Sequence, residues 1–451
     1  MNFIQNSFFL KLWWWQPTQC HLGPRCLHNS VNRKRQDSVL NHQFPFTVIA
    51  LVLLLKSQTS ASYRAISKVL VLICLYTELN LKTPSHVTIL LWIKKIGLHQ
   101  LHKTRDKSDD WIIMIDESVE FGSEKLLVIL GIREKDINFN RPLQYHDMDC
   151  LVSKVSSSWK GEDIKKVLEE LQCNIGRIKY AVADMGNAIK NALYLSKVRH
   201  VEDITHKLSL IIKHLYEKNS QFIGYTKKLA YLRGSLCLSS LSYILPPAQR
   251  VHSRFMNLKP IVDWGLAVIK KIKENNGLGN DLERLNSIIE YESIVKELDK
   301  LVHYAISIQE ELKNNGLSQE SIKNCKSVFK DNHRNRRLRT FENQVMQYLE
   351  DTIKQAKGEE KILCTSDILE SSFGKYKNSI SNNLSIGITD LSLSIAAYTV
   401  NFENDKDVRE ALTSIKVADI VQWKSANIGK TLIAKRLEVL GSGGKLKKIN
   451  A

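Results

Sequence analysis

Three aspartates stand where predicted β-strands end: Asp116, Asp184 and Asp203. In open α/β sheets, ligands and metal ions gather at the carboxyl ends of strands, so one sheet edge would hold all three carboxylates. Carboxylates that lie close together repel one another unless a positive charge separates them. Mg²⁺ and Mn²⁺ prefer such oxygen ligands, and two of these ions together can activate water for phosphodiester cleavage. The alternative is that each aspartate forms a turn or caps a helix.

The elements that would position these aspartates alternate between strand and helix. The continuous apolar runs 111–115, 125–131 and 178–183 are typical of strands that are buried on both faces. Residues 162–171 have the periodicity of an amphipathic helix, and a short helix begins at Asn187 before a last strand. This alternation predicts an α/β layer with a partly parallel sheet.

The chain then becomes almost entirely helical until about residue 360. Within this part, six apolar residues are spaced four and three positions apart, which indicates the seam of a helical pair or short coiled coil. Such a seam either joins two copies of the chain or closes an internal bundle. The six residues are Ile294, Leu298, Leu301, Ala305, Ile308 and Leu312.

Residues 45–100 show two helical patterns, and the second follows Ser85, a good N-cap. Its polar face carries Lys94 and Lys95. Short basic helices joined by turns suit a helix-turn-helix that reads a major groove, and the alternative is a helical hairpin with a solvated basic face. The periodic apolar residues are Ile66, Val69, Leu70 and Ile73, then Ile89, Trp92, Ile93 and Ile96.

The composition favours a polyanionic partner. The 451 residues include 65 lysines and arginines against 47 aspartates and glutamates, a net charge of +18. Nucleic acid and acidic membranes both suit such a charge, but the longest apolar run, 46–55, is far shorter than the ~20 residues of a spanning helix. We therefore expect DNA as the partner, no membrane, no signal peptide and a cytoplasmic, nucleoid-associated protein.

The first 40 residues mix tryptophans, prolines and basic residues without periodicity, which predicts a poorly ordered leader. Cys20, His21, Cys26 and His28 could hold zinc, but their spacing fits no familiar zinc loop. The eight cysteines form no CxxC pair, which favours reduced thiols. A second basic run, whose alternative is a solvated helix face, offers phosphate contacts at Arg334, Arg336 and Arg337.

Five segments, in consistent order, resemble blocks of a group of prokaryotic DDE transposases from insertion sequences. The third segment contains Asp203 and His206 and resembles an Asp-x-x-His block, which is related in position to the Cys-x-x-His element of hAT transposases. The resemblance extends from about residue 45 to 440. Glu117, Ser118, Ala183 and Met185 depart from the neighbours expected in the first two blocks. The five segments are 116–131, 183–187, 203–208, 245–258 and 366–377.

The resemblance implies an α/β fold, with an RNase H-like mixed-sheet core that is interrupted by a large all-α insertion and preceded by a helix-turn-helix-like domain. The implied segments are a leader (1–40), a DNA-binding domain (41–106), the first part of the core (107–206), the helical insertion (207–361), the last part of the core (362–400) and a basic C-terminal region (401–451).

The resemblance also assigns the site residues. Asp116, Asp184 and Glu370 map to the three catalytic acids, which would bind two Mg²⁺ or Mn²⁺ ions. Asp203 and His206 rank as supporting residues: Asp203 either replaces Asp184 as a ligand or orients His206. The expected DNA contacts also include Arg254 in the fourth segment and Lys375 and Lys377 after the last acid.

The expected function is therefore cut-and-paste transposition of a mobile element, by a homo-oligomer that acts on the element ends and the target DNA. Two alternatives stay open: a DNA-binding regulator with a dead core, and an RNase H-like nuclease or resolvase without strand transfer. Ser366 could cap the helix of Glu370, so an ordinary helix-start glutamate is the structural alternative for that residue.

Overall fold

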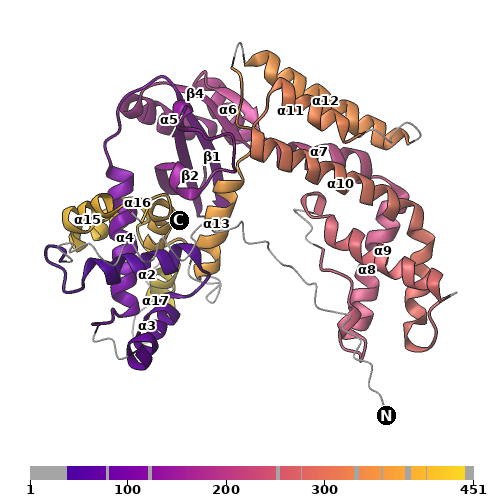
Figure 1. Ribbon diagram of the computed structural model, residues 1–451, viewed down its shortest axis with the longest axis horizontal. Helices are drawn as coiled ribbons and strands as arrows, with labels where there is room; N and C mark the ends of the chain where they lie inside the picture. Colours follow the sequence, from indigo (N-terminus) through magenta and orange to yellow (C-terminus); the bar gives the residue numbers. More distant parts are fainter. Residues whose placement is uncertain are drawn as a thin grey trace.

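A computed structural model describes residues 38–441 except 78–80, 120–123, 250–253, 276, 330–334, 357–358, 381–386 and 403. The zinc ligands considered at Cys20, His21, Cys26 and His28, and nearly all of the predicted leader, therefore lie outside the described residues, as does Arg334. Figure 1 shows two lobes: the sheet with the N-terminal and C-terminal helices, and a helical lobe beside it.

The core is a five-stranded mixed sheet with the order β3-β2-β1-β4-β5. β2 pairs antiparallel with both β1 and β3, whereas β1, β4 and β5 run parallel to one another. This order and these directions are those of an RNase H-like sheet, so the predicted fold class is confirmed. The strands are β1 (Trp111–Val119), β2 (Lys125–Arg133), β3 (Asp149–Ser156), β4 (Ile178–Ala183) and β5 (Arg199–Glu202).

Helices cover both faces of this sheet, which explains why its strands are continuously apolar. On one face, Ile113 packs in a cluster with residues of α5 (Gly161–Ile175) and α6 (Asn187–Leu195). On the other face, Ile112 shares a cluster with Leu208 and the helices that follow it. The three strands expected from apolar runs are present, and β3 is an additional edge strand.

The helical lobe interrupts the core between β5 and the last core helix, α13 (Asp367–Ile380), as expected for an all-α insertion. All six residues of the apolar seam on α10 are buried within the chain, so the seam closes an internal bundle. The main helices of the lobe are α7 (Ile204–Tyr216), α8 (Ser220–Leu236), α9 (Lys259–Glu274), α10 (Glu292–Asn315), α11 (Gln319–Ser327) and α12 (Arg336–Gln355).

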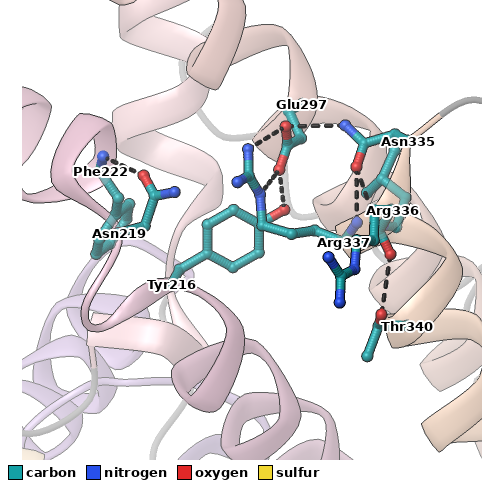
Figure 2. A network of polar contacts seen from close by, with 9 residues as sticks. Tyr216, Asn219, Phe222, Glu297, Asn335, Arg336, Arg337 and Thr340 are labelled. Carbon is teal, nitrogen blue, oxygen red and sulfur yellow. Dashed lines mark hydrogen bonds and ion pairs between the residues drawn. The ribbon is translucent and has the colours of Figure 1, made fainter.

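A polar network joins three helices of this lobe (Figure 2). The carboxylate of Glu297 on α10 accepts hydrogen bonds from Tyr216 Oη (2.6 Å), Arg337 Nε (2.6 Å) and Asn335 Nδ2 (2.9 Å). Asn335 Oδ1 in turn accepts from the backbone N–H of Arg337, at the start of α12. The Glu297 side chain is only 8% exposed, so these bonds balance a buried charge.

The N-terminal helices share a core with the C-terminal segment. The periodic residues Ile89, Trp92, Ile93 and Ile96 of α4 are buried, and they pack with Ala397 and Leu412 near the other end of the chain. The DNA-binding role and the boundaries given to 41–106 stay predictions. The elements are α2 (Phe46–Gln58), α3 (Tyr63–Thr77), α4 (His86–His102), α14 (Leu393–Tyr398), α15 (Asp405–Ser414), α16 (Val417–Asn427) and α17 (Leu432–Leu440).

The C-terminal half of α3 differs from this pattern because its apolar side chains face outward. Val69 and Ile73, which continue the periodicity of Ile66 and Leu70, are 44% and 41% exposed. Leu72 and Tyr76 are 51% and 83% exposed. Within the described residues, no helix is long and apolar enough to cross a membrane.

Candidate active site

Asp116 lies within β1, and Asp184 directly follows β4, the parallel strand beside it. The pairing of the two strands ends with Met114 opposite Val182, and each aspartate stands two residues further along the chain. Neighbouring strands are ~4.8 Å apart, so the backbone itself brings these carboxylates together. The Oδ1 atom of Asp184 also accepts a hydrogen bond from the backbone N–H of Gly186 (2.8 Å), which fixes its orientation.

Asp116 has a strongly perturbed acidity. The pKa of Asp116 is raised to about 7, chiefly by burial and also by the negative charges of Asp184 and Glu370, while the backbone N–H of Glu117 and the charge of His206 oppose the shift. These interactions show that all four side chains share one electrostatic environment. A carboxylate of this kind is stabilised by a cation, because desolvation and like charge both disfavour its ionised form.

Two helix starts complete the cluster. His206 lies in the first turn of α7, and Glu370 lies in the first turn of α13. The Nε2 atom of His206 is 3.0 Å from Oε1 of Glu370. This contact raises the pKa of His206 to about 9, with smaller contributions from Asp203 and Asp184, so the imidazole is positively charged at neutral pH.

Asp203 lies directly behind this pair and is almost fully buried, with 1% exposure. Its Oδ1 accepts from the backbone N–H of His206 (2.9 Å), and its Oδ2 accepts from the backbone N–H and the hydroxyl of Ser366 (2.7 and 2.9 Å). Burial raises the pKa of Asp203, and these hydrogen bonds oppose that shift because they favour the ionised form.

Among the described residues, one group has ligand atoms close enough together to hold a divalent ion: Asp203, His206 and Glu370, within 4.8 Å of one another. Asp203 Oδ2 already accepts two hydrogen bonds and Oδ1 accepts one, which leaves little of this carboxylate free for an ion. Asp116 and Asp184 lie outside this group, although the charges of Asp184 and Glu370 raise the pKa of Asp116. Carboxylate oxygens are the hard ligands that Mg²⁺ and Mn²⁺ prefer.

Several cations expected to contact DNA have partners within the protein. Lys94 forms an ion pair with Asp390 (2.8 Å), and Lys95 donates to the carbonyl of Leu412 (3.0 Å). Lys375 donates to the carbonyl of Ser57 (2.9 Å), and its ammonium lies 3.8 Å from the ring centroid of Tyr145. Burial and the nearby Lys56 lower the pKa of Lys375 to about 8.

The remaining expected contacts fall into three groups. Arg337 belongs to the Glu297 network, and Arg254 lies in a 3-10 turn (Arg254–Met256) that packs on α7. Arg336 and Lys377 are exposed. Arg334 lies outside the described residues. The structure therefore brings Asp203, His206 and Glu370 together, with Asp116 and Asp184 near enough to interact with them electrostatically, and it disperses the cations.

Sequence reasoning missed one residue of this region. Ser366 was expected to cap the helix of Glu370, but its hydroxyl donates to Asp203 instead. The sequence signal was present, since Ser366 stands four residues before Glu370 and Asp203 three before His206. Nothing in the sequence pairs the two, because their contact spans the whole insertion.

The comparisons with known proteins find likeness among solved structures only. No protein-family model and no curated protein matches the chain. Among solved structures, the Drosophila P element transposase strand transfer complex is similar, with 12% sequence identity and a TM-score of 0.43. The likeness covers 85% of this chain and 99% of that chain. The order and direction of the strands, rather than this likeness, define the fold.

Proposed function

We propose that this chain is a DDE-type DNA transposase, which cuts the ends of a mobile element and joins them to target DNA. The observation that supports it best is the electrostatic coupling of Asp116 to Asp184, beside it on an RNase H-like sheet, and to Glu370. Three carboxylates that influence one another in this way suit metal-dependent phosphodiester chemistry. The net charge of +18 favours double-stranded DNA as the substrate.

In this proposal Asp116, Asp184 and Glu370 hold two Mg²⁺ or Mn²⁺ ions. Bound there, the ions would supply Lewis-acid activation of the attacking hydroxyl, from water in strand cleavage and from the freed 3′ end in joining. The chain itself keeps its ligands in place: paired strands carry the two aspartates, and His206 holds Oε1 of Glu370. The charged imidazole can also donate a hydrogen bond to a phosphate oxygen, a charge-assisted contact.

Among the described cations that were expected to contact DNA, Lys377 and Arg336 are the strongest candidates for phosphate contacts. Both are exposed, and Lys377 stands seven residues after Glu370 on α13, close to two helical turns away on the same face. A DNA backbone that runs along α13 from the cleavage point would reach it. Lys94, Lys95, Lys375 and Arg337 are weaker candidates, because they already bind protein groups.

The test uses the full chain with DNA that contains the gene and its own flanking sequences. Asp116→Asn, Asp184→Asn and Glu370→Gln should each abolish Mn²⁺-dependent cleavage and joining, and they should leave DNA binding intact. Asp367→Asn is the matched control: Asp367 shares the first turn of α13 but pairs with Lys313 (2.9 Å), outside the cluster. It should cut at close to the wild-type rate.

The outcomes separate the alternatives. Specific, salt-sensitive DNA binding without metal-dependent cutting would indicate a regulator with an inactive core, and cutting without joining would indicate a nuclease or resolvase. Undiminished cutting by any of the three variants would remove that residue from the catalytic set.

We also propose that the active form is a homo-oligomer, since both ends of an element must be held together. The α10 seam does not support it, because that seam is internal. The exposed apolar side of α3, with Val69, Leu72, Ile73 and Tyr76, is the surface that favours self-association.

A further inference from the structure

Asp203 lies where the two separated parts of the RNase H-like core meet. Its backbone N–H donates to the carbonyl of Ala183 at the end of β4 (2.8 Å), and the N–H of Ile204 donates to the carbonyl of Cys364 (2.9 Å). β4 belongs to the core before the helical insertion, and Cys364 belongs to the core after it. The same short segment therefore touches both parts.

The Asp203 side chain makes the same connection with its two oxygens. Oδ1 caps α7 by accepting from the N–H of His206, and Oδ2 accepts two bonds from Ser366, immediately before α13. One buried carboxylate thus fixes the starts of two helices. Hydrogen bonds to an ionised group are about twice as strong as neutral ones, so the link is a firm one.

We propose that Asp203 is a positioning residue, which clamps the start of α7 to the start of α13 and so holds His206 against Glu370. This inference deepens the proposed function and rests on it. His206 is three residues from Asp203 along α7, and Glu370 is four residues from Ser366 along α13. Their 3.0 Å contact joins residues from opposite sides of the insertion, so it depends on how these two helix starts are held.

The clamp explains the Asp203 environment better than metal ligation does. Oδ2 of Asp203 already accepts two hydrogen bonds and Oδ1 accepts one, so three of the roughly four lone-pair positions of this carboxylate are used within the protein. Asp203 is buried behind His206, whereas Glu370 is partly exposed. We therefore place Asp203 outside the set of ligands and next to it.

The first variant, Asp203→Asn, separates the hydrogen bond to His206 from the hydrogen bonds to Ser366. Asparagine keeps an oxygen for the N–H of His206 and caps helices about as well as aspartate. Its amide nitrogen cannot accept from the N–H of Ser366. We expect faster hydrogen exchange in a peptide that covers residues 362–369, about tenfold weaker Mn²⁺ binding by calorimetry, and cleavage slowed about 10- to 100-fold.

A second pair of variants tests the clamp from the other side. Ser366→Ala removes the hydroxyl donor but keeps the N–H bond, so Mn²⁺ binding should weaken by a few-fold, and Ser366→Thr should restore it by returning the hydroxyl. Thermal unfolding of each variant checks that the fold is retained. If Asp203→Asn does not fold, the Ser366 pair decides the question.

Three results would overturn the inference: unchanged hydrogen exchange in Asp203→Asn, faster exchange with unchanged Mn²⁺ affinity, or Mn²⁺ affinity that is lost in Asp203→Asn but unaffected in Ser366→Ala. The last would make Asp203 a metal ligand. Absence of DNA cleavage by the wild-type chain would contradict the proposed function. The hydrogen-exchange and Mn²⁺-binding measurements would still test whether Asp203 positions His206 and Glu370, because neither depends on cleavage.

Discussion

Asp116 couples acidity to stability at the residue scale. Its pKa is raised from an ordinary carboxyl value to about 7, so without metal the folded state binds a proton that the unfolded state releases near pH 4. Folding stability must therefore fall as the pH rises from about 4 to about 7. Asp116→Asn removes this term, and we expect it to stabilise the metal-free protein by about 2–4 kcal/mol at pH 8, measured by urea unfolding in chelator.

The same pair of proteins supplies the control. At pH 4 the wild type and Asp116→Asn should have nearly equal stability, because the wild-type carboxyl is then protonated in the folded state. Added Mn²⁺ should raise the stability of the wild type at pH 8 and have little effect on the variant. A difference that does not grow with pH would mean that Asp116 titrates normally.

The sequence predicts the position of a residue in a strand or helix better than it predicts the group that the side chain contacts. Asp184 follows its strand directly as predicted, whereas β1 continues beyond Asp116 to Val119 because Glu117 to Val119 still pair with β2. The contacts of Lys95 and Lys375 could not be predicted. Their sequence context suggested cations that face solvent or DNA, but in the fold each ammonium donates to a backbone carbonyl. A local pattern contains no information about a carbonyl that is hundreds of residues away.

At the scale of elements, α7 connects the candidate site with the helical lobe. It begins at the clamp of Asp203 and ends at Tyr216, whose hydroxyl donates to Glu297 (Figure 2). Glu297→Ala would leave Tyr216, Arg337 and Asn335 without their acceptor. We expect a loss of about 1–3 kcal/mol in unfolding free energy by urea titration, because the Tyr216 hydroxyl and the Asn335 amide lose their acceptor, while the Arg337 side chain is 41% exposed and can be solvated.

Glu292→Ala on the same helix is the control for this prediction. Glu292 pairs with Lys273 and Lys296 at the surface, where solvent screens the interaction, so we expect little change in stability. Equal effects of the two variants would show that the Glu297 network adds nothing beyond a surface ion pair.

Strands and helices could be predicted from the sequence where burial leaves a continuous apolar run or a regular apolar spacing. β1, β2 and β4 are apolar because helices cover both faces of the sheet, and the α10 helix shows its seam as a regular spacing. β3 was missed because it is an edge strand with polar residues among the apolar ones. The sequence also could not choose between an internal and an intermolecular α10 seam, since both need the same spacing.

At the scale of the whole molecule, the outward apolar side of α3 predicts self-association. Leu72 and Tyr76 are one turn apart and more than half exposed. Leu72→Gln with Tyr76→Gln should shift the sedimentation equilibrium toward monomer without lowering the melting temperature, because neither side chain belongs to the core. Tyr194→Gln, at an exposed tyrosine on α6 and away from α3, should change neither property. Unchanged association in the double variant would exclude this surface.

The sequence did not reveal that the N-terminal helices pack against the C-terminal helices. Residues 41–106 read as a separate module, yet α4 packs against α14 and α15 from the C-terminal part. The apolar stripe of α4 predicts a buried face but does not say which element buries it. Figure 1 shows these helices together in the lobe that contains the sheet.

A pair of glycine substitutions tests this packing. A Cβ on Gly97 of α4 would lie 2.0 Å from the carbonyl oxygen of Leu393 on α14, so Gly97→Ala must push the two helices apart. We expect it to lower the unfolding free energy by about 2 kcal/mol or more. Gly374→Ala on α13 is the matched control: no described atom lies within 4 Å of its added Cβ, so helix propensity should raise stability by about 0.5–1 kcal/mol. If Gly97→Ala were also neutral or stabilising in urea titrations, α4 and α14 would not be in the close contact that unites the N-terminal and C-terminal segments.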